Sequence, residues 1–267
     1  DSHNLSLILT KRFSEGLFTE NGSENINLGY AFTDSEQTIN SRSSTAGSQF
    51  DGTAVFDPQN PAISQSGFET RHNITLSMFF REEFFAGLGV FFRASEGRPY
   101  SLTFDDGFPD FRDSGSAEEN ILAYIPTGIN DPNLSPSSDP VAVQSFLDAI
   151  NNGFQIPNGE TVNFNCDFTP GETIRRNTCR NPWFFDVDFR LTQELPFIGS
   201  LTGIKEDRIE IFADFSNFLN LLDSGWNVRR SFGDFDGRVA LLTGEFDDEG
   251  RYVLDSFRPF EAEPNVS

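Results

Sequence analysis

NPWFFDVDFRLTQE, residues 181–194, is the stretch of this sequence that decides the fold. Side chains of a β-strand alternate between its two faces, so the odd-numbered positions 183–191 share one face, and all five are apolar. The other face carries Asp186, Asp188 and Arg190. A soluble strand with one buried face gives a similar pattern. The apolar row, however, covers nearly the roughly 9–11 residues that a tilted strand needs to cross a bilayer. The stretch therefore predicts a membrane-spanning strand whose polar face lines a lumen.

The composition supports a β-rich chain. Among its 267 residues are 31 Phe and one Met, and aromatic residues favour strands over helices. The formal net charge of −22 excludes nucleic acid as a partner, because no basic patch could offset it. No run of 18 apolar residues predicts a transmembrane helix. The chain begins at Asp1 without a signal-peptide pattern, so we expect any export signal to lie upstream or to have been removed.

The two cysteines, Cys166 and Cys179, lie 13 positions apart in a polar segment. A zinc site would need further ligands, and both histidines, His3 and His72, are far away in the sequence. A disulfide is the favoured interpretation, and it indicates an oxidising compartment. Closure of a loop of this size stabilises by about 3 kcal/mol in the chain-entropy model.

Alternation of period two marks further strands on both sides of the opening stretch. The six predicted strands are Asn4–Lys11, Asn25–Thr33, Phe68–Phe80, Phe84–Arg98, Asn181–Glu194 and Asp207–Phe218. One short helix is predicted from Asp139-Pro140 to Gly153, where a capping Asp precedes an apolar run that Gly closes. Short turns at 12–24, 81–83 and 195–206 alternate with long irregular segments. Beyond residue 221 only short runs such as Arg238–Leu242 show any pattern.

The long segments, 34–67, 101–181 and 221–267, carry most of the negative charge: 26 acidic against 10 basic residues. Both lysines, Lys11 and Lys205, lie on the side of the short turns. Short periplasmic turns and long extracellular loops are typical of outer-membrane barrels. The fold prediction is therefore all-β: an antiparallel transmembrane β-barrel segment of about six strands, with long extracellular loops. A secreted β-sandwich is the alternative fold.

Four phrases carry a resemblance to a known family. They are Ser43-Ser44-Thr45-Ala46-Gly47-Ser48, Gly97-Arg98-Pro99-Tyr100-Ser101, Arg176-Asn177-Thr178-Cys179-Arg180-Asn181-Pro182-Trp183 and Ile211-Phe212-Ala213-Asp214-Phe215-Ser216-Asn217-Phe218-Leu219-Asn220. Together with the strand pattern, they resemble the C-terminal barrel portion of TonB-dependent outer-membrane receptors, in the Oar-like branch with a carboxypeptidase-like regulatory domain upstream. The resemblance covers nearly the whole chain.

The resemblance implies a plugged barrel of 22 strands. With about six strands, the chain would be a fragment that lacks the N-terminal plug, the TonB-contacting part and the closing strand. The parent protein would move a scarce or large substrate across the outer membrane of a Gram-negative-type cell with TonB-coupled energy. Its partners would be outer-membrane lipid, its own plug, the TonB complex and an unidentified substrate. A passive porin-like channel and a secreted β-sandwich binding or adhesion protein are the alternative functions.

No catalytic, metal or cofactor motif stands out, so we expect a protein that is not an enzyme and holds no cofactor or metal. The acidic clusters Asp105-Asp106, Asp234/Asp236 and Asp247-Asp248-Glu249 lack EF-hand spacing, and a solvated loop is favoured over a Ca²⁺ site. Asp186 and Asp188 share a face with Arg190, so contacts to a plug, across the lumen or to a ligand are favoured over a catalytic pair. An aromatic girdle at the two membrane interfaces explains Phe79, Phe80, Phe84 and Phe85 at one end, and Tyr100 and Trp183 at the other.

Overall fold

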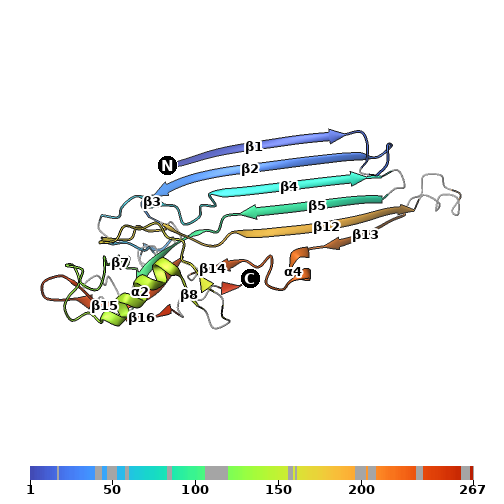
Figure 1. Cartoon of the computed structure of the whole chain (residues 1–267). Helices are drawn as coiled ribbons and strands as arrows, with labels where there is room; N and C mark the ends of the chain where they lie inside the picture. The colour runs from blue at the N-terminus through green and yellow to red at the C-terminus, as the bar shows by residue number, and fades with distance from the viewer. Residues whose placement is uncertain are drawn as a thin grey trace.

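A computed structural model describes most of the chain in two regions, a long single-layer sheet and a smaller body at one end of it (Figure 1). The smaller body, built around α2, β6, β15 and β16, is called the head below. The described residues are 1–16, 18–39, 44–46, 53–57, 60–82, 86–105, 120–155, 159, 161–195, 203, 209–232, 237–259 and 265–266.

The sheet contains all six predicted strands, in chain order and antiparallel throughout. They are β1 (Ser2–Phe13), β2 (Ser23–Gln37), β4 (His72–Arg81), β5 (Ala86–Ser95), β12 (Phe184–Leu195) and β13 (Ile209–Phe215). The short β3 (Ser64–Gln65) pairs with the end of β2. The sixth strand stops before its predicted end, because Asn217 adopts a left-handed conformation with φ 54° and the helix α4 (Phe218–Leu222) follows. The mostly antiparallel, all-β prediction is confirmed.

Strand register places the apolar rows of all six strands on the same side of the sheet. Residues directly opposite each other in a ladder project to one face, and Leu9, Leu28, Leu76, Phe92 and Val187 form one such row across five strands. We call this side the apolar face. Its apolar members include Leu5, Leu7, Leu9, Ile26, Leu28, Tyr30, Phe32, Ile74, Leu76, Met78, Phe80, Leu88, Val90, Phe92, Ala94, Phe185, Val187, Phe189, Leu191, Ile211, Ala213 and Phe215. Lys11, Glu24, His72 and Gln193, near the ends of their strands, lie on the same side.

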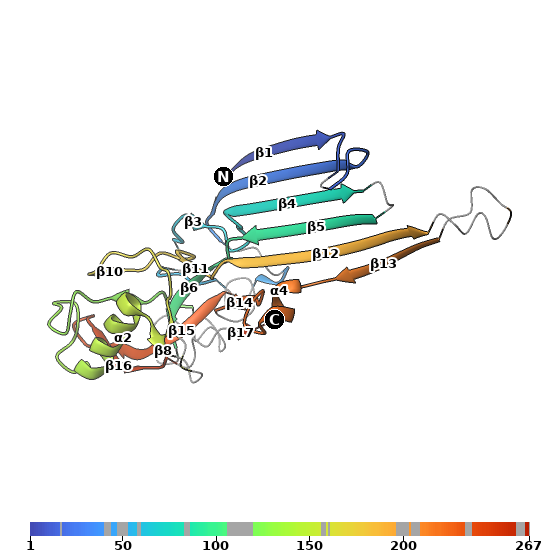
Figure 2. The ribbon, with the colours of Figure 1, turned by 45° about the vertical axis from the view of Figure 1, so that its right-hand side comes forward.

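The opposite side, called the polar face, carries hydroxyl, amide and charged side chains. Members include Ser6, Thr10, Asn25, Asn27, Asn73, Thr75, Ser77, Arg93, Asp186, Asp188, Arg190, Thr192 and Asp214, together with four large apolar side chains, Ile8, Phe79, Phe91 and Phe212. No other described layer covers either face over most of the length of the strands, as Figures 1 and 2 show. All residues of β1 and β13 are exposed, and none in β2 or β4 is buried.

The connections agree with the predicted asymmetry. Strands β1, β4 and β12 end at one end of the sheet, where β2, β5 and β13 begin, and the long segments follow β2, β5 and β13 at the other end (Figure 1). The end with the long segments is called the outer end below. At the opposite end Glu82 accepts hydrogen bonds from the backbone nitrogen of Phe18, at 3.1 Å, and from the hydroxyl of Thr19, at 2.7 Å. These hydrogen bonds link the turn between β1 and β2 to the residue that follows β4.

The described parts of the long segments contain further secondary structure, and they supply the hydrophobic core of the head. A four-stranded mixed sheet runs in the order β11 (Cys179–Arg180), β6 (Pro99–Phe104), β15 (Arg238–Phe246) and β16 (Tyr252–Phe257). β6 and β15 pair in parallel. Smaller pairs are β7 (Tyr124–Ile125) with β10 (Glu172–Thr173), β8 (Phe154–Gln155) with β9 (Thr161–Val162), and β14 (Arg230–Ser231) with β17 (Asn265–Val266). Apart from the run Arg238–Leu242 in β15, the sequence pattern missed these strands, because they are short or buried on both faces and so show no clean alternation.

The predicted helix is confirmed as α2 (Pro140–Asn152), which packs against β16. Its cap residue Asp139 accepts a hydrogen bond from the backbone nitrogen of Val141 at 2.8 Å, and Pro140 occupies the first helical turn. Gly153 ends the helix with φ 75°, a conformation that favours glycine. The buried side of α2, including Val143 and Phe146, joins the core of the head. Among the described residues no helix is long and apolar enough to span a bilayer.

Candidate functional site

The polar face holds the three predicted site residues of β12 side by side, and each has a partner within the chain. The guanidinium of Arg190 donates to both carboxylate oxygens of Asp214 on β13, at 2.5 and 2.7 Å. It also lies 5.3 Å from the centre of the Phe212 ring. Because the side chains of Arg190 and Asp214 are 59% and 42% exposed, this ion pair contributes little stability in water.

Asp186 and Asp188 hold the segment that follows β13. The carboxylate of Asp188 accepts a hydrogen bond from the backbone nitrogen of Asn217 at 2.8 Å. Asp186 accepts one from the side-chain amide of Asn227 at 2.8 Å. The two aspartates therefore act here as anchors for backbone and amide donors. Their predicted contacts to a plug domain or a ligand stay a prediction.

Polar contacts continue across the sheet on the same face. The hydroxyl of Thr10 donates to Asn27 at 2.9 Å, and the amide of Asn27 donates to Ser77 at 3.4 Å. At the end with the short turns Arg81 donates to Glu194 at 2.9 Å. Sequence alternation could have assigned these residues to the polar side of their own strands. Only the register shows that they form one continuous surface.

A buried ionic joint links the outer end of the sheet to the head. Glu69 is 2% exposed, and its carboxylate contacts the guanidinium of Arg180 on β11 and that of Arg71, the latter at 3.3 Å. The backbone nitrogen of Ser35 also donates to it, at 2.6 Å. Two guanidinium groups and a backbone N–H therefore surround the Glu69 carboxylate, and a buried charge needs such pairing and hydrogen bonding.

Arg176 strengthens the same joint. Only 2% of Arg176 is exposed, and its guanidinium donates to the carbonyl oxygens of Gln37 and Thr38, each at 2.7 Å. Burial lowers its pKa. Nothing in the sequence indicated this role, because the contacts lie 138 and 139 positions apart.

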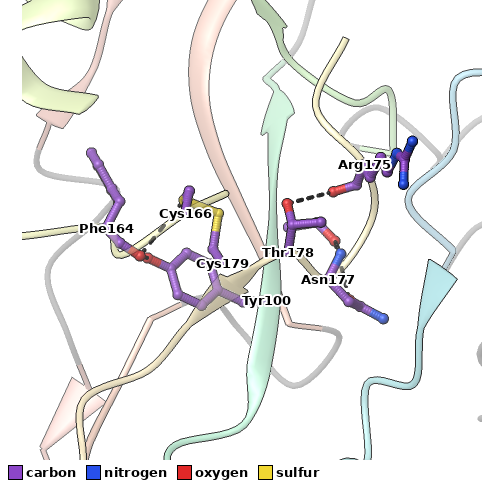
Figure 3. The surroundings of a disulfide bond; sticks show 8 residues. Tyr100, Phe164, Cys166, Arg175, Asn177, Thr178 and Cys179 are labelled. Atoms are coloured by element: carbon purple, nitrogen blue, oxygen red, sulfur yellow. Dashed lines mark hydrogen bonds between the residues drawn. A yellow bond between two sulfur atoms is a disulfide. The ribbon is translucent and has the colours of Figure 1, made fainter. Parts of the chain in front are cut away.

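The predicted disulfide between Cys166 and Cys179 is confirmed, with an S–S distance of 1.99 Å (Figure 3). Cys179 lies opposite Tyr100 in the β11–β6 ladder. The hydroxyl of Tyr100 donates to the carbonyl of Phe164 at 2.5 Å (Figure 3). The disulfide therefore joins the residue 166 segment to the head sheet at the edge of its core.

The aromatic girdle prediction is wrong for Tyr100. This side chain packs on Phe232 and is fully buried in the head, so it does not face a membrane interface. The same burial raises the pKa of the Tyr100 hydroxyl. Trp183 is 40% exposed and stacks on His72 with ring centroids 6.1 Å apart. At the other end, Phe80 lies on the apolar face and Phe79 on the polar face, as the β2–β4 register shows. Phe84 and Phe85 lie outside the described residues.

The acidic clusters that can be placed serve as turn and ion-pair residues. In the β15–β16 hairpin, Asp247 accepts from the backbone nitrogen of Arg251 and pairs with its guanidinium, each at 2.8 Å. Asp105 pairs with Arg258. Asp106, Asp234 and Asp236 lie outside the described residues. Across the described ranges, no group of three or more His, Cys, Asp or Glu side chains is placed to hold a metal ion.

Two adjoining cavities in the head are large enough for a small ligand. One has a volume of about 500 Å³ and a mostly apolar lining, and the other about 330 Å³. They share a wall formed by Ser64 and residues 173–176, so the buried Arg176 and the exposed Arg175 border both. These volumes fall in the range of known ligand sites, about 300–1,000 Å³. The sequence did not point to them.

Comparison with known proteins adds no assignment: no protein-family model, curated protein or solved structure matches this chain.

Proposed function

We propose that this chain is part of a transmembrane β-barrel of an outer-membrane receptor or transporter. The single observation that carries the proposal is the register of the sheet, which combines six separately alternating strands into one apolar face and one polar face. A barrel wall between lipid and a wet lumen requires this arrangement. The disulfide agrees with an oxidising compartment outside the cytoplasm.

The size of the apolar face favours lipid over water. Leu5, Leu7 and Leu9 are 62%, 53% and 54% exposed, and similar side chains continue across the sheet. Soluble monomers rarely expose a contiguous apolar patch beyond about 300–600 Å². The nine-residue row from His72 to Phe80 rises about 20 Å across a bilayer at about 3.3 Å per residue and a tilt of about 40°. That height approaches the apolar band of roughly 25 Å in outer-membrane barrels.

The two edges of the sheet support a larger barrel. Among the described residues β1 pairs only with β2, and β13 pairs only with β12. In hydrocarbon, each unpaired backbone group costs several kcal/mol. We therefore propose that further strands of the same barrel pair with β1 and β13, as the resemblance to TonB-dependent receptors implies.

In this orientation the head lies outside the cell and the polar face lines the lumen. The head cavities bordered by Arg175 and Arg176 are then placed to capture a substrate, and Asp186, Asp188 and Arg190 lie along its route or against a plug. A TonB complex acting through that plug would supply the energy. The proposed activity is transport or reception rather than catalysis.

Spin labels on adjacent residues test the proposal. Leu76→Cys on the apolar face and Ser77→Cys on the polar face are each labelled in the protein in its native membrane, and accessibility to oxygen and to a water-soluble nickel chelate is measured. We expect oxygen to reach the label at 76 and nickel to reach the label at 77, because oxygen concentrates in lipid. A β-sandwich would instead shield the label at 76 from both reagents, and that result would refute the proposal.

A further inference from the structure

The smaller of the two head cavities borders two short strands that each have an open edge. This cavity of about 330 Å³ is lined by residues 63–65, which contain β3, and by residues 172–176, which contain β10 (Figure 2). Among the described residues β3 pairs only with β2, and β10 pairs only with β7. Each strand therefore has one side to which a further strand could add.

The open edge of β10 lies at Thr173. The backbone nitrogen of Ile174 donates to the carbonyl of Ala123 at 2.9 Å, and Thr173 lies opposite Tyr124 in the same antiparallel ladder. Backbone groups of successive residues point to alternate sides of a strand, so the N–H and C=O of Thr173 point away from β7. Thr173 borders both head cavities, which places this edge beside them.

The open edge of β3 lies at Ile63. The backbone nitrogen of Ser66 donates to the carbonyl of Ser35 at 2.8 Å, so hydrogen bonding toward β2 falls on the even-numbered residues of this stretch. The N–H and C=O of Ile63 therefore point away from β2, and no described group hydrogen-bonds to them. The side chain of Ile63 borders the smaller cavity and is 64% exposed.

Unpaired carboxylates border the same cavity. Glu36, Asp167 and Glu172 are exposed residues of its lining, and none of them forms an ion pair with a described residue. Arg175 and Arg176 also border it, but the guanidinium of Arg176 is held by two backbone carbonyl groups. The three long segments together hold 26 acidic and 10 basic residues, so the field around the head attracts cations.

We infer that the head cavities bind a cationic peptide in an extended conformation. The peptide adds as a strand to the edge of β10 at Thr173, places an apolar side chain in the larger cavity and directs basic side chains to Glu36, Asp167 and Glu172. This inference rests on the proposed function, because it names the substrate class of the site assigned there to substrate capture. A small organic cation is the competing occupant.

The combination of features favours a peptide. An open strand edge recognises an extended backbone through main-chain hydrogen bonds, and neighbouring pockets then select its side chains. The larger cavity, of about 500 Å³ with a mostly apolar lining, has room for an apolar side chain. A small organic cation would pair with the carboxylates but would leave the strand edge and the apolar cavity unused.

Peptides of one length and different charge test the choice of ligand. The protein is purified from its native membrane in detergent, and binding of the fluorescein-labelled pentapeptide Leu-Lys-Val-Lys-Leu is followed by fluorescence anisotropy. We expect this peptide to bind about fivefold more tightly than its counterpart with serine in place of lysine, and the counterpart with glutamate to bind most weakly. Equal binding of all three would overturn the inference.

Backbone methylation of the lysine peptide tests strand addition. In a strand paired along one edge, the N–H groups of alternate residues point to the partner. Methylation of the nitrogens at either the odd or the even positions should therefore weaken binding roughly fivefold, and methylation of the other set should not. Equal effects of the two methylated peptides would overturn addition to the edge of β10.

Single variants locate the site. Glu36→Gln and Glu172→Gln should each weaken binding of the lysine peptide about two- to fivefold and leave that of the serine peptide unchanged, because each removes one exposed ion pair. Asp148→Asn, which changes an exposed carboxylate of α2 outside both cavities, is the matched control. Equal weakening in all three variants would indicate only the general negative field and would overturn the site.

The remaining outcomes separate this inference from the proposed function. Displacement of the labelled peptide by spermine as effectively as by the unlabelled peptide would indicate a small-cation site and overturn the inference. Absent peptide binding, with the label at residue 76 accessible to oxygen, would overturn the inference and leave the barrel intact. Peptide binding with the expected variant effects, but no oxygen access at residue 76, would support the peptide site and overturn the barrel.

Discussion

Leu7 in β1 and Leu241 in β15 are both strand leucines, yet Leu7 is 53% exposed and Leu241 is fully buried. The two regions that contain these leucines, the sheet and the head, differ in the same way. The head gathers apolar side chains from separate segments into a core of its own. The sheet spreads its apolar side chains over one open face. A core of its own stabilises the head, whereas no described part of the chain covers the apolar face of the sheet, and lipid is the covering that we propose.

The largest expected effect is the loss of packing in the head. Phe146 on α2 is fully buried and meets Phe257 at a centroid distance of 5.8 Å. Phe146→Ala should lower the free energy of unfolding of the head by about 3–5 kcal/mol, because a large core side chain leaves a cavity. Hydrogen exchange of the β15 and β16 amides measures this loss. Val141→Ala is the matched control, because Val141 lies on the same helix and is 71% exposed. This change should alter the free energy of unfolding little.

An arginine on the apolar face should destabilise the sheet next most strongly. Leu76 lies at the middle of β4, with Leu28 and Phe92 on either side. Leu76→Arg should cost about 2–4 kcal/mol if it lies near the bilayer midplane. Ser77→Arg, one position away on the polar face, should cost much less. Folding of the protein into lipid vesicles measures both, and equal costs would contradict the assignment of the two faces.

Removal of the disulfide should affect only the head. The Cys166→Ser, Cys179→Ser double variant should lose about 3 kcal/mol, because the unfolded chain regains the freedom of the closed loop. Exchange of the head amides should accelerate, while exchange of the β2 and β4 amides stays unchanged. Faster exchange in both regions would show that the ionic joint at Glu69 couples their stabilities.

The smallest expected effect is a loss of stability of the head at acidic pH. Burial alone would raise the pKa of Asp131, but hydrogen bonds from Thr127, Asn133 and Tyr124 outweigh it and lower the pKa from 3.8. The ionised carboxylate therefore stabilises the head above the unfolded pKa, and this contribution disappears as the pH falls through the lower folded value.

Denaturant unfolding of the head at a series of pH values from 6 down to 3 measures this contribution. Stability should fall toward the acid end in the natural protein and less steeply in Asp131→Asn. Asp148→Asn, which changes an exposed residue of α2, is the control, and its stability should depend on pH as that of the natural protein does. An identical pH dependence in Asp131→Asn would contradict the role given to Asp131.

The sheet and the head also differ in how far the sequence predicts them. Each sheet strand alternates apolar and polar residues, so Asn181–Glu194 and its five companions could be recognised one at a time. The helix from Pro140 to Asn152 was recognisable from its caps, and the pairing of Cys166 with Cys179 from the lack of other partners. These signals are local, because strand period, capping and cysteine count require no knowledge of distant neighbours.

Tertiary structure alone decided the rest. The parallel pairing of β6 with β15, the burial of Tyr100 and the contact of Glu69 with Arg180, 111 positions away, leave no local pattern. The same holds for the pocket lined by Trp183 and Trp226, which lie in separate segments of the chain. Alternation determines which side of its own strand a residue occupies. Register and long-range packing determine which strands share that side and which side chains leave the solvent, because those contacts form only when the chain is folded.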